Sequence, residues 1–166
     1  MSFFDRVFER IILAFAVLAG AIFCAITIAL TLNVAMRFFL GDSLYGMVDA
    51  IEMGLMAATF LAAPWVLHRN AHVAVDIFLT GLSAPGRRRV DIVSSAFGAV
   101  LSLVFAWASL KALLIALERG SMIRGVLVLP EWITLTAPVI GGFLLAIEFG
   151  RRMARGPAID RQQAGL

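Results

Sequence analysis

Four long apolar runs constrain the fold of this chain more than any other feature of its sequence. They extend over Ile11–Met36, Leu44–Leu67, Val90–Leu117 and Trp132–Phe149. Each approaches or exceeds the roughly 20 residues that a helix needs to cross about 30 Å of hydrocarbon. The runs lack the alternation of barrel strands, and a backbone in lipid must otherwise satisfy its hydrogen bonds within helices. The sequence therefore predicts an all-α integral membrane protein with four transmembrane helices in a single domain, residues 1–166.

The basic residues are divided unevenly between the two sides of the predicted membrane domain. Ten arginines lie on the side of the termini: Arg6, Arg10, Arg69, Arg87, Arg88, Arg89, Arg151, Arg152, Arg155 and Arg161. Arg37, Arg119 and Arg124 lie on the opposite side, and Lys111 lies within the third run. Because cytoplasmic loops carry an excess of Lys and Arg, we expect both termini in the cytoplasm. The excess of basic over acidic residues thus reflects membrane topology rather than nucleic-acid binding.

The segment between the second and third runs is too short to cross a membrane. Val75, Phe78, Leu79 and Leu82 recur in it at helical spacing. This pattern predicts a short helix at about 72–83 that lies along the cytoplasmic interface. A solvated turn would explain the arginines that follow equally well.

Two acids, Asp49 and Glu52, lie in the outer part of the second run. A carboxylate near the centre of a membrane helix costs about 2.5–3.5 kcal/mol on insertion scales, so such residues usually have a partner. Arg37 and Lys111 lie near the outer ends of the first and third runs, at matching depths. We expect these four residues to form a polar cluster in the outer leaflet. Ion pairs that fix helix packing are one interpretation, and a proton relay or ion site is another.

Small residues recur at every fourth position of the second run, at Ala50, Gly54, Ala58 and Ala62. Such a stripe lets another helix approach closely. We therefore expect this face to be an interface, although an alanine-rich sequence can produce the same stripe by chance.

The fourth run and the segment before it carry several glycines and prolines. Residues 118–131 should form a structured outer loop, and Pro130 suits the first turn of the following helix. Pro138 and the Gly141-Gly142 pair indicate a kink or a close helix contact.

Other acids near the inner ends of the runs have basic neighbours at helical spacing. We expect Glu148 to pair with Arg151 or Arg152, and Asp91 to pair with Arg87. These pairs require no functional role.

The two histidines, His68 and His72, are four residues apart, a spacing that allows both to bind one metal ion from one helix face. A third ligand is not evident nearby, and two histidines at one end of one span do not favour a haem held between facing helices. Helix capping, hydrogen bonding at the membrane interface, or a turn-stabilising pair between His72 and Asp76 is the better interpretation. Sequence motifs of catalytic and phosphate-binding sites are absent. We predict no catalytic, cofactor-binding or metal-binding residue, and no enzyme activity.

Several short motifs are together typical of one transporter family. They are Arg37-Phe38, the acids early in the second run, the exit from Ala71 to Asp76, Leu129-Pro130-Glu131-Trp132, and Pro138. With them the chain resembles, over nearly its whole length, the DctQ-like small permease subunit of tripartite ATP-independent periplasmic (TRAP) transporters. The most diagnostic motif is His72 followed by Asp76. The chain departs from the family pattern at the start of the second run. Many members have tryptophan and adjacent glutamates there, whereas this chain has Tyr45, Asp49 and Glu52. Of these residues, Glu52 best matches the family's glutamate.

The resemblance implies a non-catalytic scaffold subunit in the bacterial inner membrane. In that family a large multispan permease subunit carries the sodium and substrate sites, and a periplasmic binding protein delivers the substrate. The resemblance thus implies sodium-coupled uptake of small organic acids, with these two proteins and the lipid bilayer as partners. Arg119 and Arg124 are candidate docking contacts for the periplasmic protein, and membrane topology and solubility are an alternative explanation of both.

Two other functions stay open from the residues alone. A membrane anchor subunit of a redox enzyme complex should show haem absorbance or histidines on facing spans. A self-sufficient small transporter should move solute when reconstituted alone, and a two-fold sequence repeat would favour it; we find no such repeat.

Overall fold

The computed structural model describes residues 3–41, 45–69, 84–125 and 127–155 of the chain. Four helices account for most of them: α1 (Phe3–Leu40), α2 (Met47–His68), α4 (Ala84–Arg119) and α5 (Glu131–Arg155). Each is long and apolar enough to cross a membrane, so the prediction of four transmembrane helices is confirmed. The interface helix predicted at 72–83, with His72 and Asp76, lies outside the described residues.

Helices α1, α4 and α5 extend beyond the apolar runs that predict them. Helix α1 has 38 residues, which at 1.5 Å per residue is about 57 Å, well beyond the roughly 30 Å of hydrocarbon. The additional turns carry charged side chains, including Asp5 and Glu9 in α1 and Arg88 and Arg89 in α4. A helix can continue beyond the hydrocarbon of the membrane, because its backbone hydrogen bonds are formed within the helix and do not depend on whether lipid or water surrounds it.

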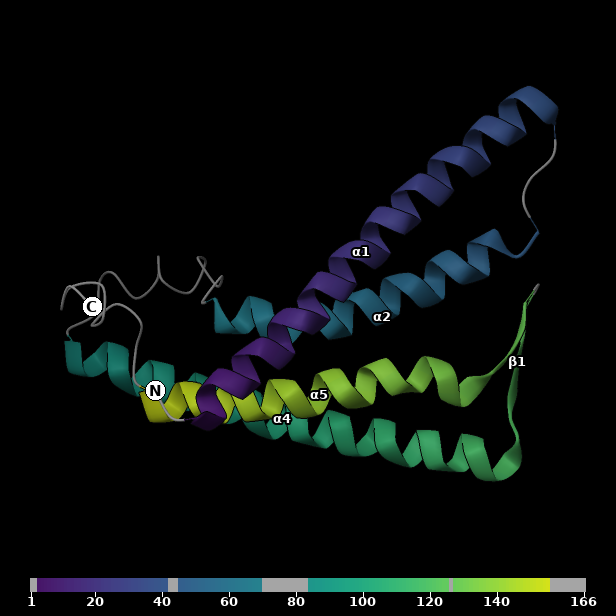
Figure 1. Ribbon diagram of the computed structural model, residues 1–166. Helices are drawn as coiled ribbons and strands as arrows, with labels where there is room; N and C mark the ends of the chain where they lie inside the picture. Colours follow the sequence, from purple (N-terminus) through teal and green to yellow (C-terminus); the bar gives the residue numbers. More distant parts are fainter. Residues whose placement is uncertain (1–2, 42–44, 70–83, 126, 156–166) are drawn as a thin grey trace.

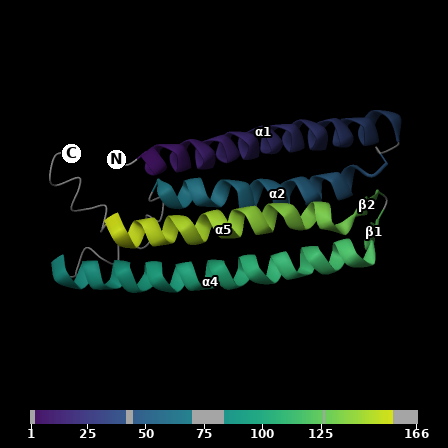
Figure 2. The ribbon, with the colours of Figure 1, turned by 60° about the horizontal axis from the view of Figure 1, so that its bottom comes forward.

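The four helices lie side by side in the order α1, α2, α5, α4 (Figure 2). The contacts agree with this order, since α1 packs on α2, α2 on α5, and α5 on α4. Helix α1 crosses the others at an angle and diverges from α2 toward Leu40 (Figure 1). The first and last described residues, Phe3 and Arg155, belong to the same end of the bundle, as four spans require (Figure 1).

Small residues form the contacts in the middle of the bundle. A buried cluster joins Ala19 of α1, Ala58 and Leu61 of α2, and Ala137 of α5. Five alanines are buried among the described residues, beside larger side chains such as Ile12 and Leu61, so close backbone approach contributes to the packing of the helices.

The glycine pair of α5 places this helix against both of its neighbours. A Cβ atom on Gly141 would collide with the carbonyl oxygen of Phe60 in α2. A Cβ atom on Gly142 would lie 3.0 Å from the Cβ of Ala106 in α4. The prediction of a close helix contact at this pair is therefore confirmed.

A short hairpin connects α4 to α5 at the far end of the bundle. Helix α4 ends at Arg119, and Gly120 follows with φ +59°, the left-handed conformation that commonly ends helices. Strands β1 (Met122–Arg124) and β2 (Val128–Pro130) then pair in antiparallel fashion. The sequence predicts a structured loop here but not the strands, and Pro130 closes β2 instead of occupying the first turn of α5.

Candidate functional site

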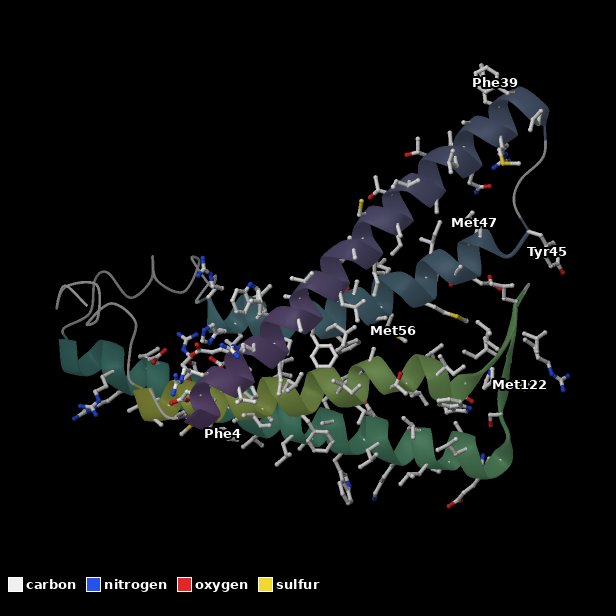
Figure 3. The ribbon with its side chains drawn as sticks, viewed as in Figure 1. Phe4, Phe39, Tyr45, Met47, Met56 and Met122 are labelled. Atoms are coloured by element: carbon white, nitrogen blue, oxygen red, sulfur yellow. The ribbon has the colours of Figure 1, made fainter. Side chains whose placement is uncertain are left out.

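Charged side chains from three helices meet at the end of the bundle that contains Phe3. Asp5 and Glu9 belong to the first turns of α1, His68 ends α2, and Glu148 and Arg151 belong to the last turns of α5. Nitrogen and oxygen atoms accordingly gather at the end near Phe4 (Figure 3). We call these five residues the inner network.

Arg151 is the centre of the inner network. Its Nη2 donates to Asp5 Oδ1 at 2.7 Å and its Nη1 to Glu148 Oε2 at 2.9 Å. Glu9 Oε1 lies 3.5 Å from the same Nη2, and the guanidinium lies 4.5 Å from the ring centroid of Phe8. A planar group with five donors suits this role, because it reaches several carboxylates at once. One arginine thus ties the start of α1 to the end of α5.

His68 adds α2 to the same network. Its Nδ1 lies 2.9 Å from Glu148 Oε1 and its Nε2 lies 4.0 Å from Glu9 Oε1. The imidazole ring also stacks on Trp65, with the ring centroids 5.6 Å apart. The side chain therefore connects α2 to both α1 and α5.

A separate ion pair connects α5 to α4. Arg152 donates to Asp91 Oδ1 from Nη2 at 2.6 Å and from Nε at 3.0 Å. Asp91 is almost completely buried, with 4% of its surface exposed. A buried carboxylate needs such a partner, so this pair fixes the position of α4 against α5.

The sequence identifies only part of these contacts. The expected pair of Glu148 with Arg151, three residues apart, is confirmed. Asp91 pairs with Arg152, whereas its expected partner was Arg87, whose side chain lies outside the described part of the structure. The hydrogen bonds between helices join residues 61 to 146 positions apart, so helical spacing cannot reveal them. The sequence does contain one indication of these contacts: the topology predicted from the four apolar runs places all of these charged residues on the same side of the membrane.

This end of the bundle is suited to fixing helices against one another. Among the described residues, no group of three or more His, Cys, Asp and Glu side chains is placed to hold a metal. The acids of the inner network are occupied by Arg151 and His68.

The acids of the second run lie at the opposite end, beside the hairpin. Asp49, in the first turn of α2, accepts a hydrogen bond at 3.0 Å from the backbone N–H of Leu127. A Cβ atom on Gly125 would collide with the same carboxylate, so the hairpin turn closes tightly over it. Glu52 and Arg124 line a cavity of about 370 Å³ next to this contact. Asp49 therefore anchors the hairpin to α2.

The predicted polar cluster of Arg37, Asp49, Glu52 and Lys111 does not form. Within the described part of the chain, no ion pair joins any two of these residues. Equal depth in the membrane is not enough to bring Glu52 and Lys111 into contact. Glu52 belongs to α2 and Lys111 to α4, and α5 lies between these two helices (Figure 2). Lys111 is exposed and lies 5.5 Å from the ring centroid of Trp107, and Arg37 is exposed near the diverging end of α1. Contact of the four residues with a partner stays a prediction.

The small-residue stripe of α2 is used partly within the chain. A Cβ atom on Gly54 would lie 3.1 Å from Ile26 Cδ1 of α1, and Ala58 is fully buried. Ala62 packs at the margin of the same cluster, whereas Ala50 is exposed. The stripe therefore meets α1 at its centre and is open at its outer end.

Comparison with protein families supplies the deciding observation. The model of the family described as "Tripartite ATP-independent periplasmic transporters, DctQ component" matches residues 26–156. The chain belongs to the DctQ component family. The match runs from the second half of α1 to the end of α5, so the contacts that α2, α4 and α5 make with one another fall within it. Comparisons with curated proteins and with solved structures give no significant match.

Membership in the DctQ family confirms the resemblance seen in the sequence and makes this chain a TRAP transporter small membrane subunit. Of the inner network, Asp5 and Glu9 precede the matched residues, whereas His68, Glu148 and Arg151 fall within them. His72 and Asp76, on which the resemblance chiefly rested, are also within the matched range although outside the described residues.

Proposed function

We propose that this DctQ-family chain is a non-catalytic scaffold that holds the large permease subunit during sodium-coupled uptake of small organic acids. A periplasmic binding protein delivers the substrate, and the large subunit carries the sodium and substrate sites. The single observation that carries the proposal is the family match over residues 26–156.

The ion pairs at the inner end support a static role. Arg151 and His68 join α1, α2 and α5, and Arg152 joins α5 to α4. Each helix is therefore fixed at this end by charged groups from a neighbour. A subunit that must keep its shape while a partner moves benefits from such fixed contacts.

The exposed apolar surface supports association within the membrane. Phe38, Val100, Val104 and Trp107 each expose more than half of their surface. In a membrane protein such a surface faces lipid or another membrane chain. Four helices side by side offer two broad faces for these contacts (Figure 2).

We further propose that the inner network lies on the cytoplasmic side of the bacterial inner membrane. Arg6 and Arg10 of α1, Arg88 and Arg89 of α4, and Arg152 of α5 all belong to that end. An excess of arginine marks cytoplasmic loops. The hairpin with Arg124 then faces the periplasm, where the binding protein approaches.

Affinity purification in a mild detergent tests the proposal. The tagged chain, expressed with its genomic neighbours, should recover a much larger hydrophobic permease subunit and show no haem absorbance. Recovery of a redox enzyme with a haem spectrum would instead establish the membrane-anchor function. Failure to recover a permease under conditions that preserve membrane complexes would contradict the scaffold function.

A further inference from the structure

One side of α4 points away from the rest of the bundle. Asp91 and Ala106 are buried on the side of α4 that meets α5. Arg89 and Val93 lie two residues before and after Asp91, and at 3.6 residues per turn this spacing places them on the opposite side of the helix. Because α4 is the last helix in the row of four, that side forms an edge of the bundle (Figure 2).

This edge carries a stripe of apolar residues with a cation at each end. Arg89 and Lys111 are the two ends, and neither forms an ion pair with any residue that the structure describes. The Nζ atom of Lys111 lies 5.5 Å from the ring centroid of Trp107. The apolar residues between the cations each expose more than half of their surface, and they are Val93, Phe97, Val100, Val104 and Trp107. We call these seven residues the α4 stripe.

The length of the α4 stripe matches the hydrocarbon core of a membrane. Lys111 lies 22 positions after Arg89. That spacing is about 33 Å along a helix, and the hydrocarbon core is roughly 30 Å thick. Tryptophan and long cationic side chains are typical of the two membrane interfaces. The stripe thus has the dimensions and the polarity of a surface that faces lipid.

Lipid fits the α4 stripe better than a protein partner does. A partner helix would need acids at two depths about 33 Å apart to pair with both cations, because a charge that loses its water without gaining a partner costs free energy. Phospholipid supplies phosphate groups at both depths without such a match. The two broad faces of the row are then left for contacts with other membrane chains (Figure 2).

A hollow of about 410 Å³ adjoins the end of the α4 stripe at Arg89. Arg89, Val93 and Phe97 line it, together with Val90 and Ser94. The Ser94 hydroxyl already donates to a backbone carbonyl oxygen at 3.1 Å. The Arg89 guanidinium is therefore the polar group that this part of the described structure leaves for a ligand. A guanidinium binds phosphate through paired hydrogen bonds, and the apolar side chains suit an acyl chain.

We propose that Arg89 binds the phosphate of an anionic phospholipid whose acyl chain lies along Val93 and Phe97. Charge complementarity favours an anionic headgroup over a zwitterionic one. The inference goes beyond the scaffold function, because it concerns the edge of the row and not the faces available to a permease subunit.

Photocrosslinking to lipid tests the site. The full chain, with any permease subunit that co-purifies, carries a benzophenone amino acid in place of Phe97. It is reconstituted into vesicles of an equal mixture of phosphatidylethanolamine and phosphatidylglycerol, and mass spectrometry identifies the adducts. We expect phospholipid adducts in which phosphatidylglycerol is favoured about fivefold, the effect expected of one arginine near an anionic headgroup.

Two substitutions separate a site from general surface charge. Arg89→Gln should remove the preference for phosphatidylglycerol, and Arg89→Lys should keep most of it. Arg88→Gln is the matched control, because Arg88 is also exposed and lies at nearly the same depth but points about 100° away and does not line the hollow. That variant should keep the preference. Equal loss in Arg88→Gln and Arg89→Gln would show that overall charge attracts the lipid, and the inference would be wrong.

The other outcomes of the same experiment also decide the inference. Equal adducts with both lipids in the unsubstituted chain would contradict headgroup recognition. An adduct with the permease subunit or with a second copy of this chain would show that protein covers the stripe, which overturns the inference and leaves the scaffold function intact. If no permease subunit co-purifies, the scaffold function fails while the lipid adducts still test the site.

Discussion

Adjacent arginines of α5 fasten different neighbours. Successive residues of a helix point about 100° apart, so Arg151 reaches Asp5 on α1 whereas Arg152 reaches Asp91 on α4. Two neighbouring positions thereby hold both sides of the row of helices. The two side chains have the same chemistry, and the direction in which each points from α5 determines which acid it pairs with.

Loss of Arg152 should destabilise the fold through the buried carboxylate that it leaves behind. We expect Arg152→Gln to lower the free energy of unfolding by about 3 kcal/mol, because Asp91 would stay buried without a partner. Denaturant titration of the purified chain in detergent measures this. The double variant Asp91→Asn with Arg152→Gln should recover part of the loss.

Arg119→Gln is the matched control, since Arg119 is exposed at the opposite end of α4 and forms no ion pair with any described residue. Equal destabilisation by both single variants would show that the Asp91 pair has no special importance.

A second contact at this scale anchors the hairpin. Asp49→Ala removes the acceptor of the Leu127 N–H, and hydrogen bonds to charged groups contribute about 1.5–3 kcal/mol. We expect the Leu127 amide to exchange its hydrogen at least tenfold faster in this variant, as measured by amide hydrogen exchange. Glu52→Ala should leave that amide protected, and faster exchange there would contradict the assignment.

Sequence spacing predicts contacts within one helix and fails between helices. The pair of Glu148 with Arg151 is visible because residues three apart share a helix face. The pair of Asp91 with Arg152 depends on which helices are neighbours, which no local pattern contains. Depth suggested that Lys111 meets Glu52, but the position of α5 between their helices prevents it (Figure 2).

Among the elements, α5 determines how the bundle packs. It lies between α2 and α4, and Gly141 and Gly142 let both helices approach it closely. Composition and length were enough to predict the four helices, because each run must satisfy its backbone in lipid. The hairpin was not predictable in this way, since three-residue strands leave almost no pattern.

Substitution of Gly141 tests the close approach. Gly141→Ala should lower the free energy of unfolding by about 1–3 kcal/mol, because the new methyl group meets the rigid backbone of Phe60. Gly150→Ala is the control in the same helix, where nothing lies within 4 Å of the added atom. That variant should be neutral or slightly stabilising, because alanine favours the helix. Thermal unfolding in detergent compares them, and a neutral Gly141→Ala would contradict the packing.

At the scale of the whole molecule, the chain combines a fixed end with open faces. Charged contacts hold all four helices at the end that contains Phe3, while α1 diverges at the other end (Figure 1). The described cavities lie at the surface, and the larger one is lined mainly by apolar side chains. This construction suits a subunit that supports a transporter and leaves the solute pathway to its partner.

Reconstituted uptake is the most direct test of this division of labour. Proteoliposomes would contain this chain, the large permease subunit, or both, with the binding protein and an inward sodium gradient supplied. Radiolabelled dicarboxylates, sugar acids and keto acids would be tried in parallel. We predict sodium-dependent uptake of one class only when both subunits are present, and none from this chain alone. Uptake by this chain alone would contradict the scaffold function.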